Sequence, residues 1–223
     1  MNLSSPAVAL TLALALSLPL AAHADTADLP EAAAQRYWSV QGGVNRLTEW
    51  PATVNFGGPT VDAALGLEKG AQFGVALGHR KGKARYELEY QHGRFDVNRV
   101  TIGAASSAAD ATGHYDVLTV NALRQLPVNE QLALYAGLGI GVGKLALPQV
   151  TVASGCRCIA AAENTGFAWQ ARVGAEHRIG AEGHGFVQAS WLSLHGASSG
   201  GASFVTYPRR GFAVLGVGFR RSF

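Results

Sequence analysis

Two glutamates, Glu87 and Glu89, lie two residues apart in "ARYELEYQ" and therefore share one face of an extended strand. Paired carboxyl groups can hydrolyse glycosides, because one protonates the leaving oxygen while the other attacks or activates water. Arg85 shares this face, however, and Arg172 follows the same alternation in "AWQARVGAE". Since opposite charges in a desolvated interior pair with one another, an ion-pair network is the preferred interpretation. Its expected members are Arg85, Glu87, Glu89, Gln170, Arg172 and Glu176.

A histidine followed closely by serines, His195 with Ser198 and Ser199, is a second candidate for chemistry. A histidine activates a serine hydroxyl when a third group orients its ring. The stretch resembles the His-x-Ser pair of lipid A deacylases, which also use a Glu on the next strand. Here Ala197 stands two residues after His195, and no Asp or Glu follows Glu182. The orienting acid is missing, so we predict no catalytic residue and do not expect an enzyme.

The two cysteines, Cys156 and Cys158, are separated by one residue. A disulfide between them would close a small, strained ring that is easily reduced. Two thiolates bind a metal ion only with further ligands, and none is near in the sequence. A local disulfide is therefore preferred over free thiols, and free thiols over a metal site. We predict no metal and no cofactor.

The beginning of the chain indicates export. An apolar run, Ala7–Leu20, precedes the small-x-small stretch Ala22-His23-Ala24, as in a cleaved signal peptide covering residues 1–24. Residues 25–36 then form a short periplasmic lead-in. The net charge of +3 comes from 18 basic and 15 acidic residues scattered along the 223-residue chain, which does not indicate a nucleic-acid partner.

Eight later segments alternate in polarity with a period of two, as strands with two different environments do. In "YAGLGIGVGK", Leu138, Ile140 and Val142 lie on one face of the strand and a row of glycines lies on the other. If the glycine face lines a narrow interior, it leaves room there for long side chains from other strands. The segments are Tyr37–Arg46, Gln72–Arg80, Ala84–Phe95, His114–Leu126, Gln131–Lys144, Phe167–Ile179, Gly185–Leu194 and Tyr207–Phe223.

Short and long connections alternate between these segments. The short ones are "KGK", "PVNE" and "GAEGH", whereas the long ones cover Leu47–Ala71, Asp96–Gly113, Leu145–Gly166 and His195–Thr206. An outer-membrane barrel has this asymmetry, with short periplasmic turns and longer outer loops. A soluble barrel would instead place its aliphatic face inside. Aromatic residues near the ends of the aliphatic faces favour the membrane alternative: Trp38, Phe73, Tyr90, Trp169, Trp191 and Phe219.

The C-terminal stretch "GFAVLGVGFRRSF" resembles the last strand of bacterial outer-membrane barrels, which ends in Phe after alternating apolar residues. With "ARYELEYQ" and "LYAGLGIGVG", it makes residues 37–223 similar to the OmpA/OmpX/Opa-like family of small barrels. The resemblance implies an all-β fold: an eight-stranded antiparallel transmembrane β-barrel with short periplasmic turns and four longer extracellular loops. It also implies that Phe219 and Phe223 form the signal that the barrel-assembly machinery reads, although Arg221 departs from the usual apolar pattern.

The resemblance implies a location in the outer membrane and leaves three functions to weigh. The first is a structural or surface-interaction role, as adhesin or antigen, with a host or cell-surface ligand bound by the loops. A small gated porin is the alternative, and a lipid-modifying enzyme is disfavoured by the missing acid. The expected partners are outer-membrane lipids and lipopolysaccharide. Arg209 and Arg210 are expected to bind lipopolysaccharide phosphate, because guanidinium groups suit it, with simple solvation at the rim as the alternative.

Overall fold

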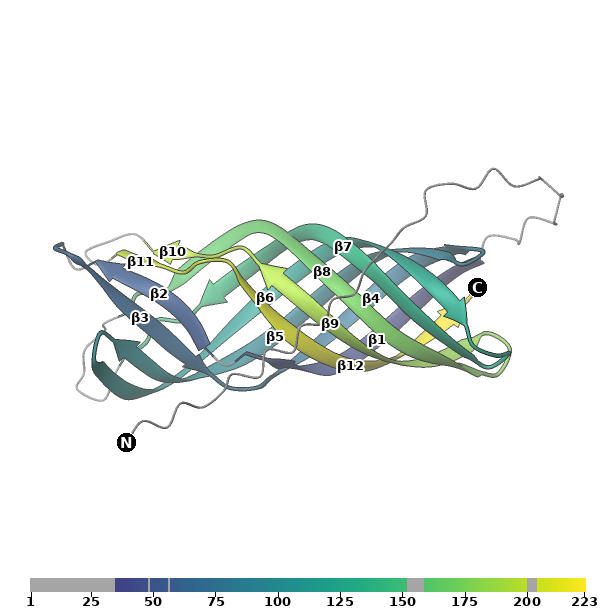
Figure 1. Cartoon of the computed structure of the whole chain (residues 1–223), viewed down its shortest axis with the longest axis horizontal. Coiled ribbons are helices and arrows are strands. Elements are labelled where there is room, and N and C mark those ends of the chain that lie inside the picture. Colours follow the sequence, from purple (N-terminus) through teal and green to yellow (C-terminus); the bar gives the residue numbers. More distant parts are fainter. Residues whose placement is uncertain (1–34, 48, 56, 152–158, 200–203) are drawn as a thin grey trace, which may run out of the picture. The chain divides into compact units, whose positions relative to one another are not determined.

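The computed structural model describes residues 35–223 except 48, 56, 152–158 and 200–203, all within one compact unit (Figure 1). The expected signal peptide, all but the last two residues of the lead-in, and both Cys156 and Cys158 lie outside the described residues. Across the described ranges, no helix is long and apolar enough to span a membrane.

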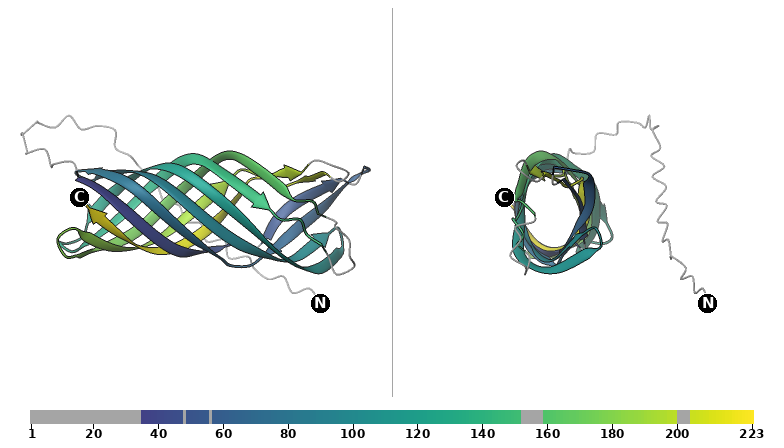
Figure 2. Two further views of the ribbon diagram at one scale, coloured as in Figure 1. Left: turned by 180° about the vertical axis from the view of Figure 1, so that it is seen from behind. Right: turned by 90° about the vertical axis from the view of Figure 1, so that its left-hand side faces the viewer.

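Eight strands form a closed antiparallel ring, because β1 pairs with β12 as well as with β4 (Figure 2). Every neighbouring pair in the ring is antiparallel, so the predicted eight-stranded barrel is confirmed. The ring consists, in order, of β1 (Gln35–Arg46), β4 (Gly70–Lys81), β5 (Ala84–Ile102), β6 (Ala105–Pro127), β7 (Leu132–Leu147), β8 (Ala162–Ile179), β9 (Gly183–Leu194) and β12 (Arg210–Ser222).

The long connections, at the end of the barrel away from the short turns, include additional β-strands. β2 (Glu49–Asn55) and β3 (Thr60–Leu67) form a hairpin that pairs with β5 on one side and with β11 (Phe204–Thr206) on the other. β11 also pairs with the two-residue strand β10 (Ser198–Ser199). β5 and β6 continue past their predicted ends to a tight turn at Gly103, which has a φ of +55° that favours glycine.

The apolar face of the long strands changes sides partway along the barrel. In β7, Leu138 is 64% exposed on the outside, whereas Leu145 is 1% exposed and points inside. β5 changes in the same way, since Leu88 faces outward but Phe95 and Val97 face inward. The half near the short turns thus has the aliphatic exterior of a lipid-facing barrel, and the other half has the buried apolar interior of a water-soluble one.

The interior of the second half is a single hydrophobic core, which we call the apolar cap. The β2–β3 hairpin contributes to it through Trp50, whose indole N–H donates to the carbonyl oxygen of Pro208 at 3.0 Å. The largest members of the apolar cap are Trp50, Leu65, Phe95, Tyr115, Leu145, Ile159, Leu192, Leu194, Tyr207 and Phe212.

The glycine row of β7 is explained by close approach of neighbouring groups. A Cβ atom on Gly139 would lie 1.8 Å from Oδ1 of Asn121, and one on Gly141 would lie 1.9 Å from the carbonyl oxygen of Leu118. Elsewhere in the barrel, tyrosine rings lie directly across glycines of the next strand, as Tyr37 does over Gly78. The glycines therefore make room for polar and aromatic side chains in a narrow interior.

Candidate functional site

The interior of the lipid-facing half is filled by a polar network, the polar plug, drawn mainly from β5 and β8. Arg85, Glu87 and Glu89 project inward from β5 because they alternate with the lipid-facing Tyr86, Leu88 and Tyr90. Gln170, Arg172 and Glu176 project inward from β8 in the same way. All six side chains are buried, so the structure brings together every residue of the predicted network.

Ion pairs cross the interior between strands that are not neighbours in the ring. Arg85 contacts Glu87 at 2.6 Å and Glu176 at 2.8 Å. Arg172 contacts Glu87 at 3.1 Å and also pairs with Glu89. Each carboxylate therefore has a guanidinium partner from its own strand or from the far side, which links opposite walls of the barrel.

The carboxylates of Glu87 and Glu89 have their acceptor positions occupied. The Tyr37 hydroxyl donates to Glu87 at 2.7 Å, in addition to the two arginines. Glu89 accepts from Gln41 at 2.8 Å and from Asn121 at 3.0 Å. Carboxylates held this way are buried and engaged by donors on both oxygens, so the geometry favours a structural network over a glycosidase pair.

Several members of the polar plug were not singled out from the sequence. Arg220 of β12 contacts Glu176 at 2.8 Å, and Tyr37 bridges Arg85 and Glu87. Gln91 donates to Gln170 at 3.0 Å. The sequence feature that could have identified them is the strand alternation, which places each of them on the inward face. Alternation alone, however, does not show which inward residues contact one another across the barrel.

No protein-family model and no curated protein sequence matches the chain. Among solved structures, the outer membrane protein OprG from Pseudomonas aeruginosa is similar with a TM-score of 0.61 at 14% identity, over 86% of this chain and 97% of that one. Neisserial surface protein A has a TM-score of 0.53 at 12% identity, over 86% of this chain and 100% of that one. The fold is that of a small outer-membrane β-barrel. At these identities the likeness concerns the fold alone.

In this small outer-membrane barrel, Arg209 precedes β12 and Arg210 is its first residue, at the end away from the short turns. Arg210 is half-buried and alternates onto the inward face with Phe212 and Val214, so the structure does not place the two arginines side by side on the outer surface. The guanidinium carbon of Arg209 is 5.5 Å from the ring centre of Phe167, which is exposed on the outer surface of β8. A cation held over an exposed aromatic ring at the edge of an apolar belt is suitably placed for lipid phosphate.

The two phenylalanines of the expected assembly signal lie at the other end of β12. The ring of Phe219 packs edge-on against Trp38 at 6.1 Å, on the outer surface near the short turns. Phe223 is highly exposed, and its backbone N–H donates to the carbonyl oxygen of Arg36 at 3.0 Å. Arg221, the departure from the family pattern, is exposed and pairs with Glu182 at 3.2 Å.

His195 and the serines near it do not form a linked catalytic group within the described part of the chain. Nδ1 of His195 lies 2.7 Å from the carbonyl oxygen of Gly196 and 3.2 Å from Nδ2 of Asn164. The hydroxyl of Ser199 instead accepts a hydrogen bond from the backbone N–H of Val205 at 3.2 Å. His195 and Ser199 thus make separate contacts with other groups in place of the nucleophile–base contact that acyl transfer needs.

Proposed function

We propose that this protein is an integral outer-membrane barrel whose outer half serves as a surface-interaction platform, in a structural, adhesin or antigen role. The observation that carries the proposal is the change of apolar face along the strands. Beyond the lipid-facing belt, β5 and β6 continue with charged residues such as Arg94, Asp96 and Asp110 outside and the apolar cap inside. A rigid, water-facing β-structure projecting from a membrane presents a fixed surface to a partner.

The interior supports this role better than it supports conduction. Charged and amide side chains interlock through the lipid-facing half, and the apolar cap fills the next layer of the interior. An eight-stranded barrel is just wide enough to be filled by side chains, so a conduit would require both layers to move. A gated porin therefore finds no specific support.

The orientation can be tested by inserting one epitope tag at two matched sites. Gly57, at the tip of the β2–β3 hairpin, and Gly82, in the β4–β5 turn, both have a positive φ and open space around them. We expect antibody to label intact cells carrying the tag at Gly57, and to label the Gly82 variant only after the outer membrane is permeabilised. The reverse pattern, or no labelling of either variant in permeabilised cells that contain the protein, would contradict the proposal.

Surface interaction can be tested with charge reversals on the hairpin, Glu49→Lys together with Asp62→Lys. Both acids are exposed on the outside of the hairpin, away from the apolar cap. Cells displaying the protein are compared with cells lacking it for adhesion to laminin- and fibronectin-coated plates and for adhesion to one another. We expect protein-dependent adhesion that the double reversal weakens several-fold, while Arg124→Gln at the other end leaves it unchanged. Equal adhesion with and without the protein would refute the platform role.

A further inference from the structure

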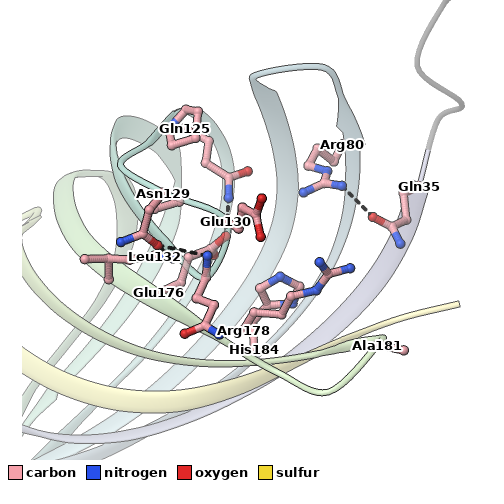
Figure 3. Close-up of a pocket in the computed structure, with 13 residues that line it drawn as sticks. Gln35, Arg80, Gln125, Asn129, Glu130, Leu132, Glu176, Arg178, Ala181 and His184 are labelled. Atoms are coloured by element: carbon pink, nitrogen blue, oxygen red, sulfur yellow. Dashed lines mark hydrogen bonds between the residues drawn. The ribbon is translucent and has the colours of Figure 1, made fainter.

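A polar pocket of about 240 Å³ occupies the barrel mouth at the end of the short turns (Figure 3). Its walls come from β1, β4, β6, β7, β8 and β9 and from the β6–β7 and β8–β9 turns, and Figure 3 shows Arg80, Arg178 and His184 among its lining side chains. The strand alternation directs these three side chains into the lumen rather than toward lipid. The pocket volume is well above what a single water molecule requires.

The positive charges of this pocket are only partly compensated. Glu176, one of its two acids, already accepts from Arg85, Arg220 and Gln125. Among the described residues, the side chain of Arg80 donates only to the neutral Gln35, at 2.8 Å. The guanidinium of Arg178 makes no ion pair within the described part of the chain. The remaining acid, Glu130, lies on the exposed β6–β7 turn.

A buried arginine behind the pocket has donors without acceptors. Arg220 is 1% exposed, and its Nε and Nη1 have no hydrogen-bond partner among the described residues. It lies next to the pocket, because it pairs with His184 across β9 and β12 and donates to Glu176. Nδ1 of His184 is likewise buried and has no hydrogen-bond partner in the part of the chain that the structure describes. Unsatisfied buried donors are costly, particularly on a charged group, so a group that accepts hydrogen bonds is expected there.

We propose that this pocket is a binding site for a phosphate group, held by Arg80, Arg178 and His184 with Arg220 behind them. Guanidinium groups donate pairs of parallel hydrogen bonds to phosphate oxygens, and several such groups around one anion replace its hydration shell. Because all four side chains belong to the lumen, the preferred source is a small soluble phosphate. A lipid headgroup folded over the rim is the other source of the same chemistry. That this mouth of the barrel opens to the periplasm rests on the proposed function, whereas the binding site itself does not.

Calorimetric titration of the refolded full barrel in maltoside detergent tests this site, with inorganic phosphate added at constant ionic strength. We expect saturable binding of phosphate that Arg80→Gln with Arg178→Gln weakens at least tenfold. The matched control removes two arginines whose side chains point outward near the same end, Arg36→Gln with Arg124→Gln, and should change the affinity less than twofold. His184→Gln, which keeps both guanidiniums, provides a second variant if the double substitution folds poorly.

The second arm uses mixed micelles containing phosphatidylglycerol in place of inorganic phosphate. Binding of either probe that the double variant loses supports the site, and the arm in which it occurs identifies the source. Binding that is equal in wild type and both lumenal variants would overturn the proposal, as would no binding of either probe by correctly folded protein. An equal loss in the outward-facing control would overturn it too, because the affinity would then come from the overall charge of the rim.

Discussion

Glu87 accepts hydrogen bonds from three groups in a buried setting: the Tyr37 hydroxyl, Arg85 and Arg172. Removing one partner of a buried ion pair leaves an uncompensated charge, which typically destabilises by about 3–5 kcal/mol. We therefore expect Glu87→Gln to lower the free energy of unfolding by about that amount. The urea midpoint of the refolded barrel measures it. Glu182→Gln breaks the exposed pair with Arg221 and should change stability by no more than about 1 kcal/mol; similar losses for both would contradict a cooperative plug.

Two buried tyrosines differ in what their hydroxyls contact. Burial raises the pKa of Tyr207, which lies between β11 and β12, and its hydroxyl has no hydrogen-bond partner among the described residues. Tyr37 instead donates to Glu87 at 2.7 Å. We expect Tyr207→Phe to leave stability unchanged or slightly raised, and Tyr37→Phe to lower it by about 1–3 kcal/mol, because a charged acceptor loses its donor. Urea midpoints of the two variants, measured side by side, check the difference; a larger loss from Tyr207→Phe would contradict it.

Arg209 lies over the exposed Phe167 and is the better placed of the two arginines for the proposed lipopolysaccharide contact, because Arg210 alternates onto the inward face of β12. Replacing both by Gln removes two positive charges and the cation–π contact with Phe167. We expect less lipopolysaccharide to be retained through purification, measured as phosphate per mole of protein. Arg36→Gln with Arg124→Gln, at the other end, is the control with the same change in charge. Retention equal to wild type would favour the alternative that the pair is merely solvated at the rim.

At the scale of the strand, the close contacts of the β7 glycines predict how much stability a larger side chain would cost. A methyl group at Gly141 would lie 1.9 Å from a backbone oxygen, so Gly141→Ala requires β6 and β7 to shift. We expect a loss of about 1–3 kcal/mol, as for other overpacked interiors. Gly42 of β1 faces outward with nothing within 4 Å, and Gly42→Ala should be tolerated. Equal stability of both variants, by urea unfolding, would mean that the interior has more free space than the contacts indicate.

Alternation in the sequence was enough to predict the eight ring strands and their inward residues, because side chains on a strand face opposite sides with a period of two. It did not predict the change of apolar face. Val117 falls on the polar side of its segment, and this position is explained only by the structure, in which Val117 belongs to the apolar cap. The hairpin β2–β3 was predicted as part of a loop, although the buried Trp50, Ala52 and Val54 of β2 follow a period of two. The composition of these two short strands is like that of a loop, and the sequence does not show what their apolar face packs against.

The candidate site depended on information that strand alternation does not contain. Arg85 and Arg172 were predicted to share an interior with the glutamates, but the contacts run between β5 and β8, which are not neighbours. The partner chosen across a barrel depends on strand tilt and stagger, which follow from closure of the whole ring. Arg220 was missed for this reason, and so was the pocket, whose walls come from six strands and two turns.

The two halves of the barrel have opposite interiors. The interior is polar in the half that lipid surrounds, and apolar in the half that water surrounds. Both halves follow one rule, since each places its apolar groups away from water or against lipid. The change occurs near Val142 and Lys144 on β7 and between Tyr90 and Phe95 on β5. The two positions are linked through β6, because Tyr90 pairs with Leu118 and Leu118 pairs with Val142, so the apolar belt ends in register on three successive strands.

Stacked in one narrow interior, the polar plug and the apolar cap should together prevent conduction. Ions would have to break the pairs of Arg85 and Arg172 in the lipid-facing half and then cross a layer that contains Trp50 and Phe95. We expect refolded protein to be silent in a planar bilayer, and to remain so when Trp50→Ala loosens only the apolar cap. Steady conductance steps that change when Glu87 and Glu89 are replaced by Gln would contradict this, because ions would then pass the charged residues of the interior. Silence from protein whose fold is verified in the same bilayers would direct the search for binding partners to the outer surface and to the phosphate pocket.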